Sequence, residues 1–187
     1  PSPINNLISN TDVSCFGGNN GAATILASGG TPGYSYQWTG SGGTNATATG
    51  LSAGNYSVTV TDGNGCSKVS NTVVSQPTAI NLNISSTPAQ CFGSSNGTVS
   101  VAASGGTPVY SYNWSNGTGT VDNLSGLTAG IYSVTVTDVH SCTSTTSVTV
   151  SQPSAIQLAN SSTPAACSAV GNGSANVVAS GGIPGYS

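Results

Sequence analysis

The stretch that decides the fold is LSAGNYSVTVTD at residues 51–62, which returns as LTAGIYSVTVTD at residues 127–138. In both copies one Tyr and two Val residues alternate with Ser and Thr, so the larger apolar side chains share one face of an extended strand. Alternation with period two predicts a half-buried β-strand. Because helix signals are absent from the rest of the chain, we predict an all-β protein.

The chain is organised as a repeat of 76 residues. Three cysteines keep this interval (91 − 15 and 167 − 91), and so do the SGG triplets that begin at residues 28, 104 and 180. A unit of this size is a small domain, since solenoid repeats usually measure about 20 to 50 residues. We therefore predict a β-sandwich at residues 1–76, a second at 77–152, and the N-terminal part of a truncated third at 153–187, arranged end to end.

Each full repeat also offers further strand patterns and one tryptophan. Residues 80–84 and 99–103 alternate apolar and polar side chains, and the turn sequence SGGTP at residues 28–32 leads to YSYQW, whose three aromatic residues fall on one strand face. A single Trp in a small domain is more often a packing anchor than a ligand platform. We predict that Trp38 and Trp114 lie at the centres of the two cores.

The tyrosine of the deciding stretch resembles the tyrosine corner of immunoglobulin-like sandwiches, in which a Tyr at the start of the sixth strand bonds back to upstream backbone. Tyr56 and Tyr132 hold this place, each just after a Leu-x-Ala-Gly sequence. The resemblance implies tandem immunoglobulin-like domains, which are also similar to polycystic-kidney-disease-like (PKD-like) domains. It further implies that both Tyr hydroxyls are structural.

Charged side chains are scarce, and this excludes several classes of partner. They make up 3% of the chain, where an ordinary soluble domain carries about a quarter. Lys68 is the only basic residue of the Lys or Arg type in the sequence. Binding of nucleic acid or of an anionic membrane surface needs several such cations. No apolar run approaches the roughly 20 residues of a spanning helix. We expect neither nucleic-acid binding nor membrane insertion.

The residue types that catalysis and metal binding require are also sparse. Four acidic residues, all Asp, are scattered along the chain, and the single histidine, His140, lies in a turn of one repeat only. Asp62, with Asn64 two residues on, has oxygens for Ca²⁺, but the second repeat replaces that Asn by His140, which favours turn capping by Asp. We expect no enzyme activity, no catalytic residue, no metal site and no cofactor.

Five cysteines in a chain rich in Ser, Thr, Gly and Asn indicate an oxidising, extracellular setting with disulfide bonds. The candidates are Cys15, Cys66, Cys91, Cys142 and Cys167, and the odd number implies a partner outside the sequence. The simple proposal pairs cysteines within a repeat, Cys15 with Cys66 and Cys91 with Cys142.

Immunoglobulin-like topology makes that pairing difficult, because its loops place the two cysteines of one repeat at opposite ends of the sandwich. A strand of about seven residues spans roughly 24 Å, whereas bridged Cα atoms lie within about 7 Å of each other. In an end-to-end array the final-turn cysteine of one domain instead faces the first-loop cysteine of the domain before it, which pairs Cys142 with Cys15. Loop entropy favours neither closure clearly, so both pairings, and free thiols, stay open.

The ordered set of motifs resembles the SprB-type repeat of Bacteroidetes surface proteins. It runs from the first cysteine through SGGTP, YSYxW, LxAGxYSVTVTD and the second cysteine to the closing SQP, and it covers both full units and the start of the third. The resemblance implies very large adhesins that are exported by the type IX secretion system, displayed on the cell surface, and in some species moved along it in gliding.

Two hypotheses about function follow. The first is a non-enzymatic stalk or filament segment of a secreted cell-surface adhesin, whose partners are neighbouring repeats and other copies in a fibre. The second is a carbohydrate-binding module that presents Tyr34, Tyr110 and Tyr186 to surface glycans beside the Gly-rich turn. Burial separates the two hypotheses, because rings packed into the sandwich favour the stalk and solvent-facing rings that line a groove favour glycan binding.

Overall fold

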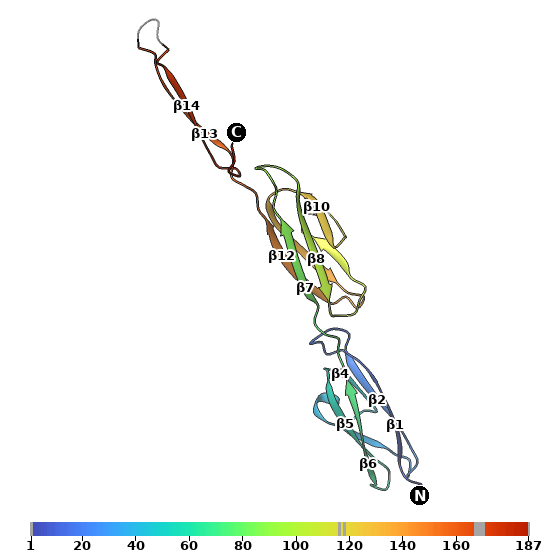
Figure 1. Cartoon of the computed structure of the whole chain (residues 1–187). Coiled ribbons are helices and arrows are strands. Elements are labelled where there is room, and N and C mark those ends of the chain that lie inside the picture. Colours follow the sequence, from blue (N-terminus) through green and yellow to red (C-terminus); the bar gives the residue numbers. More distant parts are fainter. Residues whose placement is uncertain (1, 116, 118, 167–170, 187) are drawn as a thin grey trace. The chain divides into compact units, whose positions relative to one another are not determined.

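The computed structural model describes residues 2–115, 117, 119–166 and 171–186, and these residues form an all-β protein (Figure 1). Within these described residues, fourteen strands are joined by turns, and a short 3₁₀ segment, η1 (Gly40–Gly42), follows β3. The predicted fold class is therefore confirmed at the level of secondary structure.

The first repeat contains two three-stranded sheets with the orders β1-β2-β4 and β3-β5-β6. The pairs β1 with β2, β2 with β4, β3 with β5, and β5 with β6 are all antiparallel. The strands are β1 (Asn5–Thr11), β2 (Gly21–Ser28), β3 (Ser35–Trp38), β4 (Thr47–Leu51), β5 (Gly54–Thr61) and β6 (Ser67–Val74).

Apolar side chains of both sheets meet in one core. Ile25 and Leu51 come from the first sheet, Val58 and Val60 from the second, and all four have no measurable exposure. Val58 and Val60 belong to the alternating stretch from which the strand was predicted, and Thr59 between them is half-buried. A shared core between two sheets makes the repeat a β-sandwich.

The second repeat reproduces these elements 76 residues later. Its sheets have the orders β10-β8-β7 and β12-β11-β9. Its strands are β7 (Asn81–Thr87), β8 (Gly97–Ser104), β9 (Ser111–Trp114), β10 (Asn123–Leu127), β11 (Gly130–Thr137) and β12 (Thr143–Val150). The buried side chains repeat as well, with Val99, Val134, Val136 and Val150 in the places of Ala23, Val58, Val60 and Val74.

The third segment forms a single antiparallel hairpin of β13 (Gln157–Thr163) and β14 (Ser174–Ser180). Its apolar side chains are exposed, including Leu158 at 69% and Val177 at 61%, whereas the equivalent of Val177 in the second repeat, Val101, is 2% exposed. The division of the sequence at residues 76 and 152 stays a prediction, although the strand pattern repeats at that interval.

The chain divides into two compact units that do not coincide with the repeats. One unit takes in the chain up to Asn81 together with Ala103–Tyr110 and Thr137–Ser144, and the other takes in Leu82–Ala102, Ser111–Val136 and Thr145–Ser187. Two loop segments of the second repeat thus belong to the same unit as the first repeat. Within the described ranges, no helix is long and apolar enough to span a membrane.

Candidate functional site: a disulfide between two repeats

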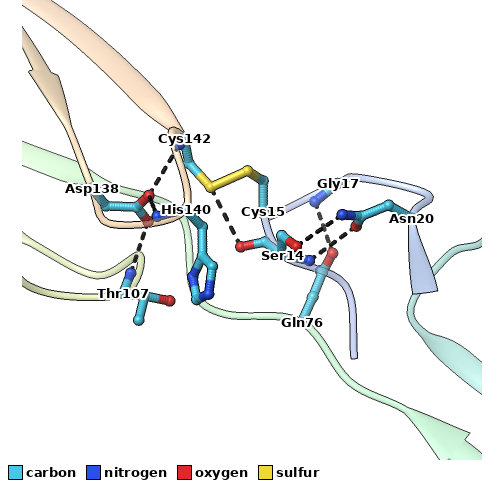
Figure 2. Close-up of a disulfide and its surroundings, with 9 residues drawn as sticks. All are labelled: Ser14, Cys15, Gly17, Asn20, Gln76, Thr107, Asp138, His140 and Cys142. Atoms are coloured by element: carbon cyan, nitrogen blue, oxygen red, sulfur yellow. Dashed lines mark hydrogen bonds between the residues drawn. A yellow bond between two sulfur atoms is a disulfide. The ribbon is translucent and has the colours of Figure 1, made fainter. Parts of the chain in front are cut away.

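The described cysteines include one disulfide, which joins Cys15 to Cys142 (Figure 2). The two residues are 127 positions apart in sequence, and their Cα atoms are 5.6 Å apart, inside the usual range for bridged cysteines. Cys15 lies in the loop between β1 and β2, and Cys142 lies in the turn between β11 and β12. The bond therefore links the first loop of one repeat to the last turn of the next, within the first compact unit.

The turn that carries Cys142 is organised by the buried carboxylate of Asp138. Oδ1 of Asp138 accepts hydrogen bonds from the backbone N–H groups of His140 at 2.9 Å and Cys142 at 3.0 Å. Oδ2 accepts the backbone N–H of Thr107 at 2.9 Å, so the turn is also tied to the loop after β8 (Figure 2). Asp62 makes the equivalent bonds to Asn64, Cys66 and Thr31 in the first repeat.

These bonds have an electrostatic consequence. The hydrogen bond from Thr107 lowers the pKa of Asp138 below its usual value, desolvation opposes this, and the bonds from Cys142 and His140 add to the lowering. The pKa of Asp62 is lowered in the same way, first by the N–H of Thr31. Both carboxylates accept backbone N–H bonds, which are best satisfied when the group is ionised.

The loop that carries Cys15 is held by a residue that follows the last strand of the same repeat. The side-chain oxygen of Gln76 accepts the backbone N–H of Gly17 at 2.7 Å. Asn20 closes the loop on itself, because its side-chain oxygen accepts the N–H of Ser14 at 3.0 Å and its amide donates to the Ser14 hydroxyl at 2.8 Å (Figure 2). The position of Cys15 is therefore set both by Asn20 within its own loop and by Gln76 after β6.

Other contacts surround the bridge. Sγ of Cys142 lies 3.3 Å from the carbonyl oxygen of Ser14, a close contact and not a donated bond, since a disulfide sulfur carries no proton. A hollow beside the bridge is lined by Phe16, Ile80 and Gly106 together with residues 141–144. Phe16 is 60% exposed, so the hollow opens to solvent.

The remaining candidate cysteines are placed differently. Cys66 and Cys91 are exposed and carry free thiols. The pairing of Cys15 with Cys66, which the sequence left open, is not formed, and neither is that of Cys91 with Cys142. Cys167 lies outside the described residues.

The two tryptophans, and the two tyrosines of the deciding stretch, pack within the sandwiches. Trp38 and Trp114 are each 2% exposed, and their indole N–H groups donate to the carbonyl oxygens of Asn45 and Val121, each at 2.9 Å. The hydroxyl of Tyr56 donates to the carbonyl of Ser52 at 3.0 Å, and that of Tyr132 donates to Thr128 at 2.9 Å. These bonds reach back four residues, as in a tyrosine corner.

The three tyrosines considered for ligand binding share one local arrangement. The hydroxyls of Tyr34, Tyr110 and Tyr186 donate to the carbonyls of Gly29, Gly105 and Gly181 in the Gly-rich turn. Tyr34 and Tyr110 are half-buried, and Tyr34 packs against the core of the first repeat. Tyr186, which follows β14, is 47% exposed.

The described ranges contain no group of three or more His, Cys, Asp and Glu side chains that could hold a metal ion. His140 takes part in the turn through its backbone N–H, which donates to Asp138.

Sequence reasoning missed the role of Gln76. In the sequence Gln76 and Gln152 stand out only as part of the closing SQP motif, yet they bond to the cysteine loops through Gly17 and Gly93. The signal was present, since the glutamine recurs at the same place in both repeats. What the sequence lacked was the proximity of the last strand to the first loop, which only the closed sandwich provides.

Comparisons with known proteins give one match to a family. The family model of the SprB repeat matches residues 8–43 and 83–119, two segments that fall at equivalent places in the two repeats. Each includes the first-loop cysteine, the SGG turn and the YSYxW sequence. No curated protein is similar enough to the sequence to count as a match.

Among solved structures, similar chains include one described as "Structural basis for Dscam isoform specificity" and the amphioxus IgVJ-C2 molecule. The first is 14% identical, with a TM-score of 0.34, over 70% of this chain and 40% of that chain. The second is 13% identical, with a TM-score of 0.34, over 79% of this chain and 96% of that chain. This chain thus spans less than half the length of the first.

Proposed function

We propose, from the two SprB-repeat matches, that this chain is a non-enzymatic structural segment of a secreted cell-surface adhesin. Its task in this proposal is to carry other parts of the adhesin away from the cell as a stalk or as part of a filament. We further propose export by the type IX secretion system and a role in adhesion or gliding, in line with the resemblance to SprB-type repeats.

The observation that carries the proposal is the bond between Cys15 and Cys142. A disulfide between consecutive repeats limits how far they separate under tension, which is what a mechanical element requires. Disulfides also persist mainly in oxidising compartments, which supports an extracellular location. The scarcity of charge supports lateral association of such segments into a fibre, because little electrostatic repulsion opposes contact.

Single-molecule stretching between the two termini tests the mechanical role. The 127-residue separation closed by the disulfide is hidden from the applied force while the bond is intact. At about 3.4 Å per extended residue, addition of a reductant should release roughly 430 Å of further contour length. The variant Cys142→Ser should give the full length with and without reductant. A contour length that is the same with and without reductant in the unmodified chain would contradict the proposal.

The carbohydrate-binding alternative has less support. The Tyr34 and Tyr110 hydroxyls bond to backbone carbonyls of their own turns, and Tyr34 packs against the core, so these rings are committed to the fold. A glycan array probed with the whole chain distinguishes the hypotheses. The stalk proposal expects no saturable binding, whereas binding that is lost in Tyr110→Ala and kept in Ile131→Ala, a change at an exposed position, would favour the alternative.

A further inference from the structure

The free cysteine of the second repeat sits in a loop that copies the loop of Cys15. The side-chain oxygen of Gln152 accepts the N–H of Gly93 at 2.8 Å, as that of Gln76 accepts the N–H of Gly17 at 2.7 Å. The N–H of Gln90 donates to the side chain of Asn96 at 2.9 Å, which repeats the 3.0 Å bond between Ser14 and Asn20. Cys91 is therefore presented in the same conformation as a cysteine that is bonded.

The surroundings of Cys91 repeat as well. A hollow beside it is lined by Phe92, Ile156 and Gly182, the equivalents of Phe16, Ile80 and Gly106 beside the disulfide. In the first hollow the remaining wall is the turn at residues 141–144. The lining of the second hollow contains no described counterpart of that turn. The hollow at Cys91 thus has the same lining as the bonded site except for the turn that supplies the second cysteine.

The first repeat also contains the other kind of site, a last turn whose cysteine, Cys66, is free. Asp62 accepts the N–H groups of Asn64 at 3.0 Å and Cys66 at 2.9 Å, as Asp138 does for His140 and Cys142. The turn that presents Cys66 therefore has the geometry of the turn that presents Cys142, and its thiol is exposed.

We propose that each repeat carries two bonding sites: a first-loop cysteine, here called the acceptor, and a last-turn cysteine in an Asp-x-x-x-Cys sequence, here called the donor. Cys91, in its hollow, then forms a disulfide with the donor cysteine of a further repeat of this kind. Cys66 is the donor for the acceptor loop of another such repeat. The bond between Cys15 and Cys142 is then one link of a regular series. This inference rests on the proposed function in one respect: it assumes that repeats of this type follow one another in tandem.

The chemistry is thiol–disulfide exchange and needs a low-molecular-weight disulfide as oxidant. One cysteine thiolate attacks that disulfide, forms a mixed disulfide and releases one small thiolate. The second cysteine thiolate attacks the protein sulfur of the mixed disulfide and releases the other. Two protein thiols lose two electrons and two protons, and the oxidant becomes two small thiols.

The test extends the whole chain so that the third repeat is complete. Ser187 is the equivalent of Ser111 (111 + 76), so a copy of residues 112–152 appended after Ser187 gives a third repeat of full length and brings a cysteine equivalent to Cys142 to position 218 (142 + 76). After oxidation by a small disulfide, non-reducing chymotryptic digestion and mass spectrometry should find Cys91 linked to the added cysteine. Alkylation of Cys91 should fall at least tenfold relative to a control with serine in the added position.

Cys66 provides an internal reference, because the extended chain adds no acceptor loop before the first repeat. Its alkylation should stay unchanged. A Cys91 that remains as reactive as in the 187-residue chain, or a link from the added cysteine to Cys66, would overturn the inference. Persistence of the bond between Cys15 and Cys142 in that experiment would leave the proposed function intact, whereas its absence would remove the support for both.

A second extension guards against failure to fold. Residues 36–76 of the first repeat, appended after Ser187, give a third repeat with a different sequence and a cysteine in the same place, since Ser35 is also equivalent to Ser187. Blue-shifted emission of the added tryptophan reports that the repeat has closed. If neither extension closes, the inference is overturned, because it requires the third unit to fold as the first two do.

Discussion

Gln76 and Gly17 are joined by a hydrogen bond of 2.7 Å, from the backbone N–H of the glycine to the side-chain oxygen of the glutamine. The two residues are 59 positions apart in sequence, Gly17 in the loop between β1 and β2 and Gln76 just after β6. A residue just after the last strand thereby holds the loop that presents Cys15. Gln152 and Gly93 repeat the arrangement around Cys91.

Replacement of Gln76 by alanine should loosen the Cys15 loop. Loss of one hydrogen bond typically costs about 0.5–1.5 kcal/mol of unfolding free energy. Because a looser loop exposes its sulfur more often, reduction of the disulfide by dithiothreitol should also become faster. Gln152→Ala is the matched control, since it acts on the loop of the free Cys91 and should leave the reduction rate as it is. Equal rates in both variants would show that the bond does not position Cys15.

Replacement of Cys142 by serine should destabilise the chain against urea. The bond closes a separation of 127 residues, for which the loop-entropy model gives about 5 kcal/mol at 25 °C. Cys66→Ser removes an exposed free thiol from the equivalent turn and should change the unfolding midpoint little. Similar midpoints for the two variants would mean that the disulfide constrains the unfolded chain much less than the model requires.

The lowered pKa values of Asp62 and Asp138 predict the response to acid. A folded pKa below the unfolded one stabilises the protein above the unfolded pKa, near 3.8, and this stabilisation is lost as pH falls through the folded pKa. Thermal melts should therefore be constant from about pH 7 to 5 and decline below that.

Asp138→Asn should lower the melting temperature at pH 7 and flatten its decline in acid, because the asparagine has no charge to lose. Asp122 is exposed, and its carboxylate accepts a hydrogen bond from the side chain of the neighbouring Asn123. Asp122→Asn should therefore leave the decline of the melting temperature in acid unchanged. A decline that Asp62→Asn and Asp138→Asn together leave unchanged would contradict the assignment.

Replacement of Gly106 by alanine should disturb the hollow beside the disulfide. Its φ is +59°, and an added Cβ would lie 2.7 Å from Cγ1 of Ile80 and 2.8 Å from Oδ2 of Asp138. Gly93→Ala isolates the backbone contribution, because its φ is +73° and nothing lies within 4 Å of the added atom. The left-handed backbone alone costs roughly 1–2 kcal/mol. Urea unfolding should show a larger loss for Gly106→Ala than for Gly93→Ala, and equal losses would show that the site relaxes freely.

Much of the fold could be predicted from the sequence, because alternation along a strand is a local property. The stretch at residues 51–62 contains β5, and Val58 and Val60 are buried as their spacing indicates. Residues 39–50 have only a weak pattern, and β4 (Thr47–Leu51) lies partly within them, with Ala48 and Leu51 buried on either side of exposed residues. Its register shifts against β2, so it does not follow strict alternation.

The candidate site was less accessible to sequence reasoning. The cysteines could be recognised as candidates from their spacing, but the choice of partner depends on which loops meet in space. Tyr34 shows the same limit, since it lies just before β3 (Ser35–Trp38) and its hydroxyl turns back to Gly29. The recurrence of Gln76 as Gln152 marks the position but does not identify its partner, because Gln76 and Gly17 come together only when the last strand has closed on the first loop.

Lys68, the single residue among Lys and Arg, lies between Cys15 and Cys142 in sequence. A protease specific for basic residues therefore has one site in this chain, and a cut there does not divide it. Residues 1–68 and 69–187 stay attached to each other through two sulfur atoms. The crosslink acts as a second connection in parallel with the backbone over a separation of 127 residues, so one break anywhere along that span leaves the polypeptide in one piece.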